Sequence, residues 1–163
     1  MKMGTDMHVA IEVRRNDYDY KSKSIQPKWF FVKKWSVDRC YSLFGCFGNY
    51  RCDWSNALDL PCATNLSYEL KSEAEDGYYG FHIVTPDRLK KEVLNWSPSK
   101  SEWEEYEGEN CEPPVIDKEW FFDTSVYLGN DEYIDDPINY WIYKLALKKY
   151  GKDNVRLIVY FDS

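Results

Sequence analysis

The sequence predicts an α+β fold in one domain, since 163 residues is about the length of a single globular unit. Three observations carry this prediction: residues 8–14 alternate apolar and polar side chains, residues 137–150 carry helix start and stop signals, and residues 155–161 are almost continuously apolar. We expect a mixed or antiparallel sheet that includes the N- and C-terminal strands. Two helices, at about 86–95 and 137–150, should pack on it, and long ordered loops should connect these elements.

The first strand shows the period-2 pattern of a half-buried strand. One face carries Val9, Ile11 and Val13, and the other carries His8, Ala10, Glu12 and Arg14. The polar residues 16–27 then predict a long turn, followed by a second, aromatic-rich strand at 29–32. These two strands are expected to form a loose hairpin.

The middle of the chain is predicted to be mostly loop. Residues 39–49 contain Gly45 and Gly48, which favours a short helix that ends in a loop. Residues 50–80 are rich in turn-forming side chains and lack periodicity, so we expect a long ordered connection. Long ordered loops often carry functional residues.

The two predicted helices each begin with a capping residue followed by proline. Thr85 precedes Pro86, and Asp136 precedes Pro137. The core-facing stripe of the second helix is expected to consist of Ile138, Trp141, Ile142 and Leu145. The helix should stop at Gly151 and lead into a central strand, residues 155–161, which should pair near the first strand.

Among the tryptophans, apolar surroundings favour three as core residues, namely Trp29, Trp120 and Trp141. Three others lie in predicted loops and are expected at the surface, namely Trp54, Trp96 and Trp103. The five cysteines show neither a disulfide framework nor a metal-binding spacing, so we interpret them as reduced and mostly buried.

Charge and hydropathy narrow the classes of partner and compartment. The net charge of −7 disfavours nucleic acid and anionic lipid as partners, because both require clustered basic side chains. The chain has neither a membrane-length apolar run nor a signal-peptide pattern, which predicts a cytoplasmic protein. Residues 100–119 are strongly acidic and contain Pro113-Pro114, so we expect an exposed excursion from the domain.

Histidine and acidic side chains suggest where chemistry could occur. Asp6 and His8 lie at the start of the first strand, and Asp76 and His82 lie in a glycine-containing loop before a helix start. If these two segments converge, Asp6, His8 and His82 could hold a divalent metal, or the helix N-terminus could hold a phosphate. The alternative is that each histidine is a partly buried residue engaged in structural hydrogen bonds.

Arginines beside aromatic side chains suggest a second kind of site. Arg39 and Arg51 flank the aromatic segment that contains Tyr41, which fits either recognition of an anionic, stackable ligand or ordinary ion pairing. The candidate ligand-binding residues are therefore Asp6, His8, Glu12, Arg39, Tyr41, Asp76 and His82.

Several short motifs resemble those of a family of small uncharacterised proteins encoded by bacteria and their phages. They are Gly4-Thr5-Asp6-Met7-His8, Arg39-Cys40-Tyr41-Ser42-Leu43-Phe44, Leu60-Pro61 with Ser67 and Glu69, Asp76-Gly77 with His82, and Phe161-Asp162. The resemblance implies a phage or mobile-element origin and a site near the histidines. Members of that family usually carry a His-x-His pair where this chain reads Tyr78-Tyr79-Gly80-Phe81-His82.

Because that pair is missing, we expect a non-catalytic binding protein of phage or mobile-element type, which engages a host protein or a small anionic ligand. One alternative is a divalent-metal-dependent hydrolase centred on Asp6, His8 and His82. A second alternative is an inhibitor that imitates nucleic acid through its acidic residues 102–119 and binds a basic partner.

Overall fold

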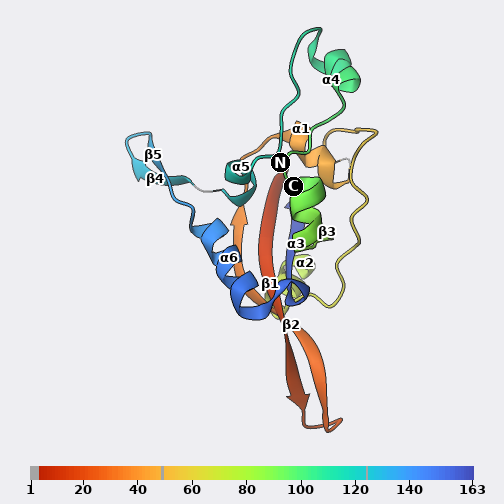
Figure 1. Cartoon of the computed structure of the whole chain (residues 1–163), viewed down its shortest axis with the longest axis vertical. Helices are drawn as coiled ribbons and strands as arrows, with labels where there is room; N and C mark the ends of the chain where they lie inside the picture. Colours follow the sequence, from red (N-terminus) through yellow and green to blue (C-terminus); the bar gives the residue numbers. More distant parts are fainter. Residues whose placement is uncertain (1–3, 49, 124) are drawn as a thin grey trace.

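The fold is α+β and is built on a four-stranded antiparallel sheet with the order β2-β1-β6-β3 (Figure 1). A computed structural model describes residues 4–48, 50–123 and 125–163, with side-chain detail for all of these except 16–19 and 25–27. The four strands are β1 (Asp6–Asp19), β2 (Ser24–Ser36), β3 (Tyr79–Val84) and β6 (Val155–Asp162). The predicted pairing of the N- and C-terminal strands is confirmed, because β1 and β6 run antiparallel with Val9 opposite Val159.

The hairpin of β1 and β2 is longer than the sequence predicts. Pairing continues out to Asp19 opposite Ser24, so the predicted turn at 16–27 is wrong and only residues 20–23 connect the strands. The outer half of the hairpin extends beyond the body of the molecule (Figure 1). A backbone ladder there requires no buried face, which is why the apolar alternation does not reveal it.

The remaining elements lie around this sheet. They are α1 (Tyr41–Phe44), η1 (Gly45–Phe47), α2 (Tyr68–Glu75), α3 (Pro86–Arg88), η2 (Leu89–Val93), α4 (Lys100–Glu107), α5 (Lys118–Phe122), β4 (Ser125–Gly129), β5 (Glu132–Asp135), α6 (Ile138–Tyr150) and η3 (Lys152–Asn154). The Thr85 cap is confirmed, since its side chain accepts a hydrogen bond from Arg88 N at 3.3 Å. Residues 50–80 were expected to be a connection, but they contain α2, which buries only Leu70 and therefore shows no periodic apolar pattern.

Both faces of the sheet are covered, so the expectation of a half-buried first strand is wrong. Met7, Val9, Ile11 and Val13 enter a large core with the helices α1, α5 and α6. The opposite face places Ala10 in a smaller core with Leu70, Ile158 and Tyr160. Helix α2 contacts this second face, so His8 and Glu12 of β1 are largely covered instead of facing water.

Helix α6 is rotated relative to its prediction. It buries Asn139, Tyr143 and Ala146, whereas the predicted core residues Ile138, Trp141 and Leu145 are 48%, 57% and 64% exposed. Tyr143 packs against Phe122 of α5, and the Asn139 amide donates to the Phe122 carbonyl oxygen at 3.0 Å. Aromatic stacking and a buried amide hydrogen bond therefore determine the orientation of this helix more than aliphatic content does.

The tryptophan and cysteine predictions also require correction. Trp54 and Trp96 are buried, and their indole N–H groups donate hydrogen bonds to the carbonyl oxygens of Ser42 and Asn56. Trp29 and Trp120 are only partly buried. All five cysteines are free thiols, and only one of them, Cys46, is buried. No helix in the described residues is long and apolar enough to cross a membrane.

Candidate functional site

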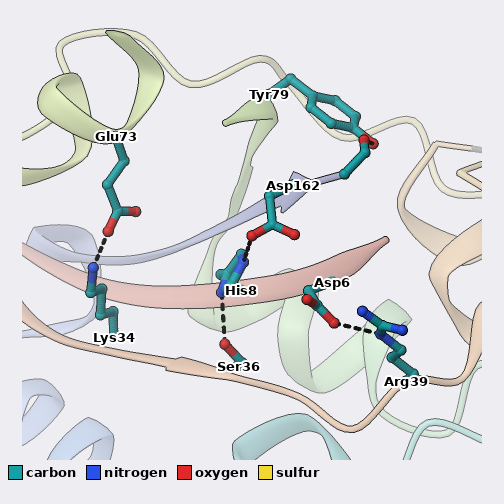
Figure 2. A network of polar contacts seen from close by, with 9 residues as sticks. Asp6, His8, Lys34, Ser36, Arg39, Glu73, Tyr79 and Asp162 are labelled. Carbon is teal, nitrogen blue, oxygen red and sulfur yellow. Dashed lines mark hydrogen bonds and ion pairs between the residues drawn. The ribbon is translucent and has the colours of Figure 1, made fainter. Parts of the chain in front are cut away.

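His8 lies in a polar cluster at one end of the sheet (Figure 2). Its Nδ1 is 2.7 Å from Ser36 Oγ on β2, and its Nε2 is 3.2 Å from Asp162 Oδ2 on β6. The rings of Tyr78 and Tyr160 contact the imidazole with centroid distances of 5.3 and 5.2 Å. Both ring nitrogens are engaged within the protein, which agrees with the structural interpretation of this histidine.

His82 lies on the opposite face of the sheet. His82 pairs across the strands with Val159, which lies in the larger core, whereas His8 pairs with Tyr160, which lies in the smaller core. Residues paired across strands share one face of the sheet. Neighbouring residues along a strand point to opposite faces, so the two imidazoles are separated by the sheet itself. His82 Nδ1 is 2.7 Å from the carbonyl oxygen of Gly80. The convergence of His8 and His82 that a shared metal site would require is therefore not present.

The predicted metal site lacks its geometry for the same reason. Asp6 shares a strand face with His8, but its Oδ1 accepts a hydrogen bond from Arg39 Nε at 2.6 Å. Asp76 is exposed at the C-terminal end of α2. Across residues 4–48, 50–123 and 125–163, no three His, Cys, Asp or Glu side chains are arranged to hold a metal ion.

The arginine and tyrosine candidates form an ion-paired group near the chain ends. The hydrogen bond from Arg39 to Asp6, together with their charge attraction, raises the pKa of Arg39. The Tyr41 hydroxyl accepts from Arg51 Nη2 at 3.5 Å and from Thr5 N at 3.3 Å, and these contacts lower the pKa of Tyr41. The Arg51 guanidinium also lies 4.6 Å from the centre of the Tyr41 ring. Of the two interpretations, these contacts match internal pairing.

Glu12 is a structural residue in this fold. Its carboxylate is fully buried and accepts from Arg156 Nη2 at 2.8 Å and from Ser67 N at 2.7 Å. The Arg156 guanidinium also donates to the carbonyl oxygens of residues 64 and 65 and lies over the Trp29 ring. This buried pair ties β1, β6 and the segment before α2 together.

Two polar residues near His8 are missed by the sequence-based prediction. Tyr160 points into the layer between the sheet and α2, where burial, followed by the nearby Glu73 carboxylate, raises the pKa of its hydroxyl. Glu73 is ion-paired with Lys34 of β2 (Figure 2). No sequence pattern indicated these two residues, because Tyr160 lies on an almost continuously apolar strand and Glu73 lies in a helix that the sequence did not predict.

The acidic segment at 100–119 is partly folded onto the domain. Helix α4 (Lys100–Glu107) is capped by Ser99, whose side chain accepts a hydrogen bond from Glu102 N at 3.3 Å. The rings of Trp103 and Tyr106 pack against buried Trp54, with centroid distances of 6.0 and 5.6 Å. This aromatic contact holds α4 at one end of the molecule (Figure 1).

A groove between α6 and the segment formed by α3 and η2 has the properties of a ligand site. Its volume is about 480 Å³, within the roughly 300–1,000 Å³ usual for small-molecule sites. Its apolar surface is formed by Pro86, Leu89, Leu94, Phe122, Tyr140, Tyr143 and Leu147. Its charged side chains are Lys90, Lys118, Lys144, Lys152 and Asp87.

The lysines of this groove converge on an aromatic side chain. The ammonium groups of Lys118 and Lys144 lie 4.3 and 5.4 Å from the centre of the same ring, that of Tyr140. Lys152 is 3.5 Å from Asp87, the one acidic side chain that lines the groove among the residues that the structure describes. Four positive charges and one negative charge thus meet here, in a chain whose net charge is −7.

Few features of the sequence indicate this groove. Its lysines occupy four separate segments. Lys118, Lys144 and Lys152 have acidic or neutral neighbours along the chain, and Lys90 belongs to a short basic pair with Lys91, patterns that favour an interpretation as solvated surface. Only the packing of α6 against α5 and η2 brings them together.

A scan of protein-family models and searches of curated proteins and of solved structures find no match to this chain, so the phage-family resemblance stays a prediction.

Proposed function

We propose that this protein binds a small anionic ligand with an apolar or aromatic portion, and that the lysine-lined groove beside α6 is its binding site. The convergence of Lys118 and Lys144 on the Tyr140 ring is the observation that carries this proposal. The proposal keeps the expected class, a non-catalytic binding protein of phage or mobile-element type. It moves the site away from the histidines.

The charge distribution supports an anionic ligand. Lysines in an acidic protein are normally dispersed among carboxylates, whereas the groove places four of them around one concave surface. Mutual repulsion between these ammonium groups disfavours the empty groove, and a bound anion would relieve it. The attraction is partly screened in solution, so binding should weaken as salt increases.

The apolar surface of the groove supports a ligand that also has an apolar portion. The partly exposed side chains of Tyr140, Leu94 and Leu147 offer apolar surface in the groove. Burial raises the pKa of the Tyr143 hydroxyl, which therefore stays neutral. An aromatic or aliphatic portion would gain from leaving water, at roughly 25 cal/mol per Å² of apolar area. A phosphate or carboxylate attached to a ring fits both properties.

Isothermal titration calorimetry with phenyl phosphate tests this proposal. Wild type should bind phenyl phosphate more tightly than either inorganic phosphate or benzyl alcohol, because each of these supplies only half of the required chemistry. Lys144→Glu should weaken binding at least about tenfold, which corresponds to roughly 1.4 kcal/mol. Lys100→Glu is the matched control, since Lys100 is an exposed lysine on α4, away from the groove.

Equal affinity for phenyl phosphate and benzyl alcohol would contradict an anionic ligand. Equal loss of binding in Lys144→Glu and Lys100→Glu would mean that overall charge, and not this groove, attracts the ligand. Circular dichroism of both variants would verify folding, which is expected to persist because both lysines are exposed.

A further inference from the structure

The outward face of α6 carries a row of exposed apolar side chains. Ile138, Trp141 and Leu145 follow the i, i+3, i+7 spacing of one helix face, opposite the buried face formed by Asn139, Tyr143 and Ala146. Nearly half or more of each of the three outward side chains is exposed. We call these three residues the α6 stripe. It is separate from the groove, which lies along the flank of the helix that carries Tyr140 and Lys144.

Opposite charges lie at the two ends of the α6 stripe. Asp135 and Asp136 precede the first turn of α6, and Lys148 and Lys149 occupy its last turn. These charges also suit the dipole of the helix on which they lie. A second consequence concerns association: a surface that is acidic at one end, apolar in the middle and basic at the other end is complementary to itself.

We propose that the α6 stripe is a two-fold interface between two copies of this chain, in which the α6 helices pack antiparallel. A two-fold axis midway between Ile138 and Leu145 places Ile138 of one copy against Leu145 of the other, and Trp141 near its counterpart. The same axis sets Asp135 opposite Lys148 twice. Isologous contacts of this kind are the commonest form of homo-oligomer.

The hairpin of β4 and β5 is consistent with this arrangement. It precedes α6 directly, extends away from the body of the molecule (Figure 1), and exposes Tyr127, Leu128, Tyr133 and Ile134 by 50–65%. An isolated two-stranded hairpin is marginally stable in water. In an antiparallel dimer each hairpin would lie beside the C-terminal half of the partner's α6.

Sedimentation equilibrium of the full chain tests this proposal directly. Wild type should form a dimer, and Trp141→Glu should raise the dimer dissociation constant at least about thirtyfold, the effect typical of a central interface residue. Tyr68→Glu is the matched control, because Tyr68 lies on α2 and is 83% exposed. A monomeric wild type at the highest soluble concentration would overturn the proposal, as would a Trp141→Glu variant that still dimerises.

A charge-reversal pair separates self-association from binding of another protein. One variant carries Asp135→Lys and Asp136→Lys, and the other carries Lys148→Glu and Lys149→Glu. Each alone brings like charges together at both ends and should be monomeric, whereas an equimolar mixture should form heterodimers. Failure of the mixture to associate, with both variants folded by circular dichroism, would refute the two-fold geometry. Phenyl phosphate binding uses other residues, so the two proposals can fail independently.

Discussion

Glu12→Ala should destabilise the protein by about 3–5 kcal/mol, because it leaves the guanidinium of Arg156 buried without its carboxylate. The Glu12 and Arg156 side chains are 0% and 5% exposed, so water cannot replace the lost partner without opening the layer beneath α2. The variant also removes the acceptor of Ser67 N. The loss is a large part of the roughly 5–15 kcal/mol that holds a typical domain folded. In a chain of this size it corresponds to a fall in Tm of about 6–20 °C.

Urea unfolding followed by circular dichroism would measure this change. Glu92→Gln is the control, because Glu92 pairs with Arg88 at the surface and such pairs contribute at most about 1 kcal/mol. The combined variant Glu12→Leu with Arg156→Met should recover most of the lost stability, since a buried pair can often be replaced by apolar side chains of similar volume. A loss below about 1 kcal/mol in Glu12→Ala would refute the assignment of this pair as a structural link.

Three further predictions concern a titrating carboxyl, thiol reactivity and a close backbone approach. Burial raises the pKa of Asp123, so the folded state favours its protonated form and the contribution of Asp123 to stability should fall as pH rises above about 4. Between pH 4 and 7, the urea midpoint of the wild type should therefore fall relative to that of Asp123→Asn. Exposed Cys62 should react with a thiol reagent in the native protein, whereas buried Cys46, whose thiol pKa is raised by that burial, should react only on unfolding, as followed by mass spectrometry. Gly80→Ala should lower Tm, because Gly80 has φ of 70° and an added Cβ would meet the Tyr50 hydroxyl.

The His8 surroundings illustrate how far local sequence can identify a site. The pattern at the start of the chain correctly indicates a strand with Asp6, His8 and Glu12 on one face. Their partners come from other parts of the chain: Ser36 and Asp162 for His8, and Arg156 for Glu12. Strand register decides these partners, and register depends on long-range pairing that the local pattern does not encode.

Local chemistry determined the elements whose signals are contained in a few neighbouring residues. The alternation after His8, the cap at Thr85 and the apolar run after Val155 predicted a strand, a helix start and a central strand, and the structure contains all three. Each signal depends on backbone geometry or on hydrogen bonds within a few residues. Two of these features, the alternation and the apolar run, also carried the α+β prediction.

The tertiary structure alone decided which faces are buried. Three of the four residues predicted for the core stripe of α6 face outward because Asn139 and Tyr143 find specific partners on α5, while Ile142 packs partly against the core. Trp54 is buried where α4 folds over it. Burial is a property of what packs against a residue, and a single helix can have two faces apolar enough to be buried. The sequence by itself therefore determined β1 near His8, the start of α3 and the central strand β6, while long-range packing decided the groove, the α6 stripe and the separation of the two histidines.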